Sequence, residues 1–192
     1  MVNENTLKLI KGFEKLKLSA YHGEADQPGI YTIGWGHVIT GHEELTHGID
    51  LFKPNQLMWD VKITKEQAET LLQHDISKAQ KGVQLSLNSG VWNLLTSDQQ
   101  GAVVSLVFNI GSGGFKESRV RVSLNSGAPG LAYAFFKSWI SSNGKRQNGL
   151  IRRRAAEVAL YKSDYPMLDY FLSGSSIGVI NKAKKYIGVE DE

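Results

Sequence analysis

Residues that break helices are concentrated in one early stretch of this chain, and they limit what its N-terminal part can fold into. The glycines and prolines between Leu18 and Thr40 are Gly23, Pro28, Gly29, Gly34 and Gly36. They exclude a helix there, while the Ile-Tyr-Thr-Ile run of residues 30–33 favours a strand. The sequence therefore predicts a small antiparallel hairpin sheet near the N-terminus.

Apolar residues elsewhere recur at helical spacing. A first helix is predicted over residues 5–15, capped by Asn3 or Asn5. Thr64, followed three residues later by Gln67, forms a capping-box pattern, and it predicts a helix that ends near Gly82. The predicted apolar face of that helix is Ala68, Leu71, Leu72, Ile76 and Ala79.

The second half of the chain is also predicted to be helical. A mostly buried helix covers 99–110, starting from Thr96 or Ser97, and the glycine-rich run 111–114 stops it. Further helices are predicted at about 115–125, 130–140 and 150–161, with a short one near 179–186 in a less regular tail. Residues 41–60 have no clear period and predict a loop with one short helical turn. The predicted fold class is α+β, mostly helical with one small sheet.

Composition limits the class of protein. A chain of 192 residues is long enough for one domain and too short for two ordinary ones. The absence of cysteine excludes disulfide scaffolds, thiol catalysis and zinc sites built on sulfur. No apolar run approaches the roughly 18 residues that span a bilayer, and residues 1–11 lack the profile of a secretion signal. We expect one domain, made in the cytoplasm and without stable membrane insertion.

The charge balance is modestly basic. A net charge of +3 and a pI near 9.0 favour anionic partners. Lysine and arginine are scattered, apart from residues 152–154 and the trio Lys182, Lys184 and Lys185. Nucleic-acid binding would require a basic face with interleaved aromatic residues, so no nucleic-acid partner is predicted. Consecutive helical positions point about 100° apart, so we expect the three arginines of 152–154 not to share one partner.

One carboxylate occupies a position suited to catalysis. Glu14 ends the first predicted helix among apolar neighbours, where desolvation would raise its pKa. A second acid, Glu24 or Asp26, falls in the polar turn of the hairpin, where water would keep it ionised. Two carboxyl groups in such different surroundings are what glycosidic bond cleavage requires.

The order of these residues resembles a known family. Glu14, an acid some ten residues later, and the run Tyr31-Thr-Ile-Gly-Trp-Gly-His37 resemble the active-site signature of the phage-type lysozymes, glycoside hydrolase family 24. Three further segments are similar to that family and occur in its order: 61–72 with Asp75, 99–111 with Gly114-Phe115, and 149–161. The resemblance covers the chain from about Leu7 to Tyr161.

The resemblance implies roles for individual residues. It makes Glu14 the general acid and Thr32 the residue that helps hold the attacking water. The family's turn acid lies nine residues after the glutamate and six before the threonine. In this chain the first count gives Gly23 and the second gives Asp26. A three-residue insertion in the hairpin reconciles them, so Asp26 is favoured and Glu24 is the second choice. The positions implied to bind substrate are Gly36, Val38, Phe108 and Asn109, although core packing is an equal interpretation for Val38 and Phe108. One arginine among 152–154 is implied to support Glu14.

The resemblance also implies an activity and an architecture. The expected enzyme is an endolysin-like muramidase that hydrolyses the β-1,4 bond between N-acetylmuramic acid and N-acetylglucosamine in peptidoglycan, with inversion and without a cofactor or metal. A hairpin lobe of about 17–60 and a helical lobe of about 61–161, which includes the N-terminal helix, would flank the cleft. A C-terminal extension, 162–192, is expected to pack on the body. The implied setting is the host bacterial cytoplasm, with a holin opening the route to the wall, and we expect a monomer.

Three alternatives stay open at this point. If neither turn acid reaches the site, a lytic transglycosylase with a single glutamate would give anhydro-sugars. The histidines at 22, 37, 42 and 47 would suit a zinc amidase, but they match no zinc motif. A non-catalytic wall-binding module would use aromatic platforms such as Trp35, Trp92 and Trp139, and would not need Glu14 and Thr32 together.

Overall fold

The structure is a computed structural model that describes residues 2–22, 30–39, 57 and 60–190. Its contacts divide the chain into two compact units, one of residues 14–77 and one of residues 1–13 and 78–192. The predicted loop over 41–60 and the hairpin turn with Glu24 and Asp26 lie almost wholly outside the described residues. The two units are described in turn.

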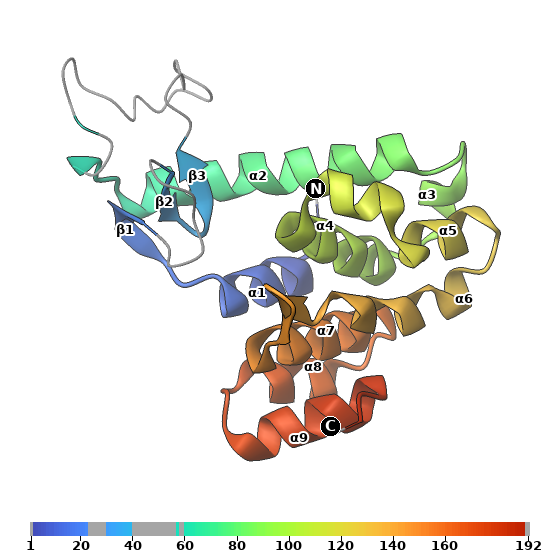
Figure 1. The fold of residues 1–192 in the computed structure, drawn as a ribbon. Coiled ribbons are helices and arrows are strands. Elements are labelled where there is room, and N and C mark those ends of the chain that lie inside the picture. Colours follow the sequence, from blue (N-terminus) through green and yellow to red (C-terminus); the bar gives the residue numbers. More distant parts are fainter. Residues whose placement is uncertain (1, 23–29, 40–56, 58–59, 191–192) are drawn as a thin grey trace. The chain divides into compact units, whose positions relative to one another are not determined.

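The unit of residues 14–77 is built on a small antiparallel sheet (Figure 1). Its strands are β1 (Lys17–Tyr21), β2 (Tyr31–Gly34) and β3 (His37–Ile39), and β2 lies in the centre. Thr32 of β2 is paired with Val38 of β3, and the β1–β2 register shifts between Lys17 and Tyr21. The predicted hairpin sheet is therefore confirmed, with three strands.

The first part of α2 (Lys65–Ser86) completes the core of this unit. The capping box predicted at its start is present, because Thr64 N donates to Gln67 Oε1 at 2.8 Å and Gln67 N donates to Thr64 Oγ1 at 3.2 Å. A Cβ at Gly34 would lie 3.6 Å from that of Ala68, which shows how closely β2 approaches the helix. The predicted apolar face is buried at all five positions.

The helical unit is organised around α7 (Asn148–Tyr161), in which every residue from Arg153 to Tyr161 is buried. It packs against α1 (Glu4–Phe13), α4 (Ser97–Glu117), α8 (Tyr165–Leu172) and α9 (Ile177–Ile187), as Figure 1 shows. The shorter elements are α3 (Val91–Leu94), α5 (Arg119–Asn125), α6 (Pro129–Ala132), the 3₁₀-helix η3 (Tyr133–Trp139), β4 (Ser141–Ser142) and β5 (Lys145–Arg146).

Several predicted helix boundaries were wrong. Helix α2 continues past Gly82 to Ser86 and buries Val83 fully, and the glycine is there because Ser112 packs against it and leaves no room for a larger residue. Gly111 has a non-helical backbone (φ 76°, ψ 161°), so the first helix of α4 stops at the glycine run as predicted, but a second short helix that was not predicted there follows it up to Glu117. The helix predicted over 130–140 is mostly a 3₁₀-helix.

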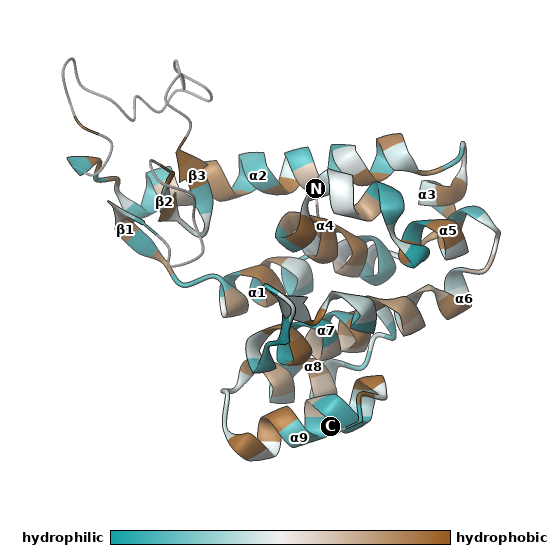
Figure 2. Cartoon of the chain, viewed as in Figure 1, coloured by the Kyte–Doolittle hydropathy of each residue, from teal (hydrophilic) through white to brown (hydrophobic). Residues whose placement is uncertain are grey.

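The C-terminal tail is more regular than predicted. Two helices, α8 and α9, occupy it, and α9 buries Val179, Ile180 and Ala183 while contacting α7. The prediction that the tail packs is confirmed for these residues, but Ile177 is 72% exposed. Figure 2 shows both hydrophobic and hydrophilic residues along α9, as its buried and exposed sides require. None of the helices in the described part of the chain is both long and apolar enough to cross a bilayer.

Candidate active site

Glu14 lies between the end of helix α1 and the start of strand β1. Helix α1 is capped at its start by Asn3, whose Oδ1 accepts from Thr6 N at 2.9 Å, and it ends at Phe13, one residue before Glu14. The glutamate is therefore outside the helix predicted to contain it, and its side chain is half-buried. Because Glu14 follows the helix, its side chain does not project from the helix surface.

The Glu14 carboxyl lies against the turn between β2 and β3. A Cβ built at Gly36 would stand 3.2 Å from Glu14 Oε2 and 3.6 Å from its carboxyl carbon. Gly36 also has φ of +86°, a conformation that residues with a side chain rarely adopt. Glycine at position 36 therefore provides both the turn and the space for the carboxyl.

The threonine predicted to act beside Glu14 is on the central strand of the same unit. Thr32 is buried, with 7% of its surface exposed. Its side-chain hydroxyl makes no hydrogen bond with another residue in the described part of the chain. A hydroxyl on a mostly buried residue that makes no such bond is suited to hold a water or a ligand atom.

Val38 and Trp35 differ from their predicted surroundings. Val38 is 47% exposed on β3, so the core-packing interpretation of this residue was wrong, and its side chain is accessible to a ligand. Trp35 is 7% exposed, so it is part of the core and cannot serve as an exposed aromatic platform. Gly36 is at the turn described above.

A hydrogen bond between His37 and Asp75 fixes the start of β3 on helix α2. His37 Nδ1 and Asp75 Oδ2 are 2.8 Å apart, and His74 Nδ1 is 3.5 Å from Asp75 Oδ1. His37 directly follows Gly36, so this pair holds the turn that faces Glu14. Sequence reasoning considered His37 as a metal ligand and missed its pairing with Asp75. His42 and His47 lie outside the described residues. Among the residues that the structure does describe, no three metal-binding side chains form a group.

Removing the acceptor from this pair is expected to destabilise the protein. Asp75→Asn should lower the free energy of unfolding by about 1–3 kcal/mol, because the nearly buried His37 loses a charged partner. Urea unfolding measures the loss. His74→Gln is the matched control, and it should cost less because its nitrogen lies farther from the carboxylate. Equal losses for the two variants would contradict this account of the pair.

Glu24 and Asp26 both lie outside the described residues, so the preference for Asp26 stays a prediction.

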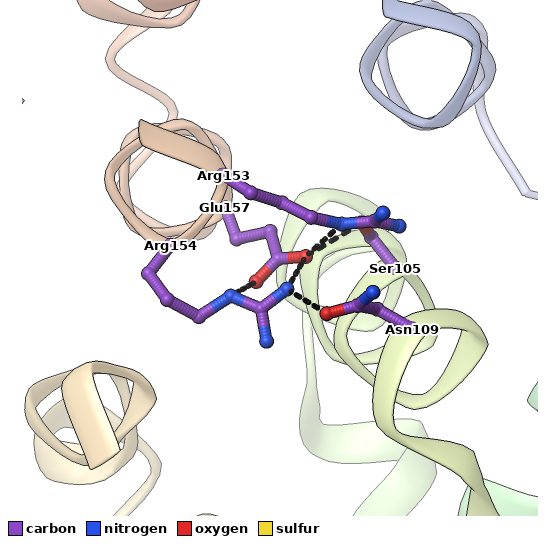
Figure 3. A network of polar contacts seen from close by, with 5 residues as sticks. All are labelled: Ser105, Asn109, Arg153, Arg154 and Glu157. Atoms are coloured by element: carbon purple, nitrogen blue, oxygen red, sulfur yellow. Dashed lines mark hydrogen bonds and ion pairs between the residues drawn. The ribbon is translucent and has the colours of Figure 1, made fainter. Parts of the chain in front are cut away.

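Helices α4 and α7 share a buried polar network (Figure 3). Glu157 is fully buried, and its Oε1 accepts from Ser105 Oγ at 2.8 Å, Arg154 Nη2 at 3.1 Å and Arg153 Nε at 3.3 Å. Its Oε2 is 2.8 Å from Arg154 Nε. The expectation that neighbouring arginines cannot share a partner was wrong, because Glu157 is one helical turn away from both and their long side chains converge on it.

The two positions predicted to line the cleft in the helical unit lie beside this network. Asn109 is exposed, and its Oδ1 accepts from Arg154 Nη2 at 2.9 Å. Phe108 is half-buried. The network thus orients the Asn109 amide, a role that sequence reasoning did not assign. The spacing of Arg153, Arg154 and Glu157 by three and four residues was the available signal.

Arg152 has a separate role. Its Nη1 donates to the carbonyl of Gly174 at 2.6 Å, and its guanidinium lies 4.6 Å above the ring of Phe13. Burial lowers the pKa of Arg152 below its ordinary value. These contacts bind α7 to its neighbours in the helical unit.

Comparison with known proteins agrees with the predicted resemblance. The family model described as phage lysozyme matches residues 11–157. The endolysin of Acyrthosiphon pisum secondary endosymbiont phage 1 is 40% identical over 166 residues, which are 84% of this chain and 98% of that protein. The endolysin of Bacillus phage PZA is 37% identical over 165 residues, which are 86% of this chain but only 56% of that longer protein.

A solved structure shares the fold. The endolysin of Escherichia coli O157:H7 phage FAHEc1 superposes with a TM-score of 0.64 and 31% sequence identity, over 85% of this chain and 94% of that one. The mostly helical α+β fold with a small antiparallel sheet, predicted from sequence, is thereby confirmed as a lysozyme fold.

Proposed function

The chain belongs to the phage lysozyme family, and from this premise we propose that it is a muramidase that cleaves the β-1,4 bond between N-acetylmuramic acid and N-acetylglucosamine in peptidoglycan. The observation that carries the proposal is the position of Glu14. Its carboxyl lies against Gly36, in the same unit as the Thr32 hydroxyl, which makes no hydrogen bond with another described residue. Family membership supports the lysozyme class of glycoside hydrolase, and the bond and the stereochemistry are the proposal.

In the proposed reaction, Glu14 acts as the general acid. It donates its proton to the glycosidic oxygen as the bond to the anomeric carbon breaks, which lets the leaving sugar depart as a neutral alcohol. Its half-buried carboxyl limits contact with water. The Gly36 backbone beside it leaves room for the sugar chain, because no side chain covers the carboxyl from that position.

Thr32 and Asp26 serve the opposite face of the sugar in this proposal. The Thr32 hydroxyl forms a hydrogen bond with the attacking water, and Asp26 removes a proton from that water. Inversion by direct water attack requires the two carboxyl groups to be about 6.5–9.5 Å apart. Val38, exposed on β3, and Phe108 and Asn109 on α4 are proposed to contact the glycan.

Digestion of purified peptidoglycan, followed by mass spectrometry of the soluble fragments, tests the reaction type. We expect reducing muramic acid ends that carry the mass of one added water. Anhydro ends would replace the hydrolase by a lytic transglycosylase. Free stem peptides with intact glycan would overturn glycosidase activity altogether, as would the absence of soluble products from a folded protein.

Substitution of the two turn acids tests which of them acts. Asp26→Asn is expected to lower activity about 10²–10⁴-fold, the range for loss of an acid–base group. Glu24→Gln, the matched control in the same turn, is expected to keep most of the activity. Release of soluble fragments per unit time measures both. The reverse ranking would move the second acid to Glu24.

Gly36→Ala tests the space beside Glu14. We expect the free energy of unfolding to fall by about 1–2 kcal/mol, because alanine is strained at positive φ. We also expect activity to fall, because the methyl group displaces the carboxyl of Glu14. Gly90→Ala is the matched control, since Gly90 has φ of +82° and nothing within 4 Å of an added Cβ. It should lose similar stability and no activity. Full activity in Gly36→Ala would contradict the assigned geometry.

The setting of the reaction is proposed from the same resemblance. The enzyme would form one domain with a hairpin lobe of about 17–60 and a helical lobe, act as a monomer, and reach the wall from the bacterial cytoplasm through a holin. Endolysin relatives support the peptidoglycan substrate.

A further inference from the structure

A small polar pocket lies within the helical unit, apart from every residue proposed for catalysis. Its volume is about 240 Å³, and the side chains of Asn3, Gln80, Trp92, Ser97 and Gln100 line it, together with a valine and a glycine. None of the lining residues is charged, although charged residues make up 21% of the chain. A phosphate or carboxylate would find no cation in this lining.

The walls of the pocket are held by hydrogen bonds between elements. Asn3 Nδ2 donates to Asp98 Oδ1 at 2.7 Å, which joins the residue before α1 to the first turn of α4. Gln100 Nε2 donates to the carbonyl of Trp92 at 2.9 Å, which joins α4 to α3. The pocket is therefore formed before any ligand arrives, and binding requires little ordering of its walls.

Other polar groups of the lining have no such structural task. The Gln80 amide and the Ser97 hydroxyl make no hydrogen bond to another residue among those the structure describes. Trp92 is half-buried. An aromatic ring together with a few polar groups that both donate and accept is the usual make-up of a pocket for a small neutral ligand.

We propose that this pocket binds one neutral N-acetylated pyranose ring and serves as a secondary sugar site. The apolar face of a pyranose packs on an indole, while its hydroxyl and acetamido groups pair with amide and hydroxyl side chains. The volume is below the roughly 300–1,000 Å³ of pockets for drug-sized ligands, so it suits a single ring. That the ring belongs to a wall glycan rests on the proposed function.

Titration with N-acetylglucosamine tests the site in the full chain carrying Glu14→Gln, which removes catalysis from the measurement. The indole N–H signals are followed by NMR, and the Trp92 signal is assigned from its loss in Trp92→Phe. We expect a saturable shift of that signal with a millimolar dissociation constant. Gln80→Leu should weaken binding about tenfold, by removal of an amide partner. Gln84→Leu, on an exposed residue one turn further along α2, should leave binding unchanged.

A Trp92 signal that does not move, or that moves equally in Gln80→Leu, would overturn the proposal. So would a shift confined to the other tryptophans, because the sugar would then bind elsewhere. The result is separate from the proposed activity. A responsive Trp92 with no soluble product from peptidoglycan would retain the sugar site and refute the muramidase.

Discussion

A Glu14→Gln variant is expected to fold normally and to lose about 10²–10⁴-fold in the rate of peptidoglycan cleavage, the usual contribution of a general acid. Glutamine has the size of glutamate but no proton to give to the glycosidic oxygen. Because the carboxyl lies against Gly36, which leaves room for a side chain of this size, we expect no steric strain from the amide.

The rate of fragment release, with circular dichroism and urea unfolding as checks on the fold, measures this effect. Glu4→Gln is the matched control, since Glu4 is an exposed glutamate in the first turn of the helix that precedes Glu14. It should retain full activity. Wild-type turnover by a folded Glu14→Gln protein would remove the central assignment.

The largest expected effect on stability comes from the buried network of the helical unit. Glu157 contacts both Arg153 and Arg154 there. Removal of one partner from a buried ion pair leaves an uncompensated charge and costs about 3–5 kcal/mol. We expect Glu157→Gln to lower the free energy of unfolding by that amount.

Urea unfolding with the linear extrapolation tests this prediction. Ser105→Ala is the matched control, because it removes a hydrogen bond to the same oxygen without removing a charge. Its expected cost is about 1.5–3 kcal/mol, the range for a hydrogen bond to a charged group. A smaller loss in Glu157→Gln than in Ser105→Ala would show that the charge of Glu157 is not what stabilises the network.

The local parts of this fold were accessible from the sequence. The capping-box pattern at Thr64 and the predicted start at Thr96 or Ser97 marked the starts of α2 and α4, and the structure has a capping box at both threonines, formed by groups within one turn of each other. Glycine and proline marked the sheet region for the same local reason. The start of α8 carried a comparable signal that was missed, with Asp164 as its cap and Pro166 in its first turn.

The errors have tertiary causes. Gly82 was taken as a helix end, but it lies inside α2, where a glycine is required because Ser112 occupies the space of a side chain. The glycine run after Ile110 does end the first helix of α4, but a second short helix was missed there, and it forms as Phe115 becomes fully buried. Arg153 and Arg154 share Glu157 because long side chains bend toward a buried charge.

The sequence by itself determined the family, the small early sheet, the helical remainder and the choice of Glu14 and Thr32 as candidates, since each depends on residue type and on spacing along a short stretch. Only the tertiary structure decided that Glu14 lies against Gly36, that His37 pairs with Asp75 and that Glu157 joins two arginines to α4. These contacts connect residues on different elements, or depend on burial that no local pattern encodes. The physical reason is that a side chain takes its partners from whatever the folded chain brings within about 3 Å of it.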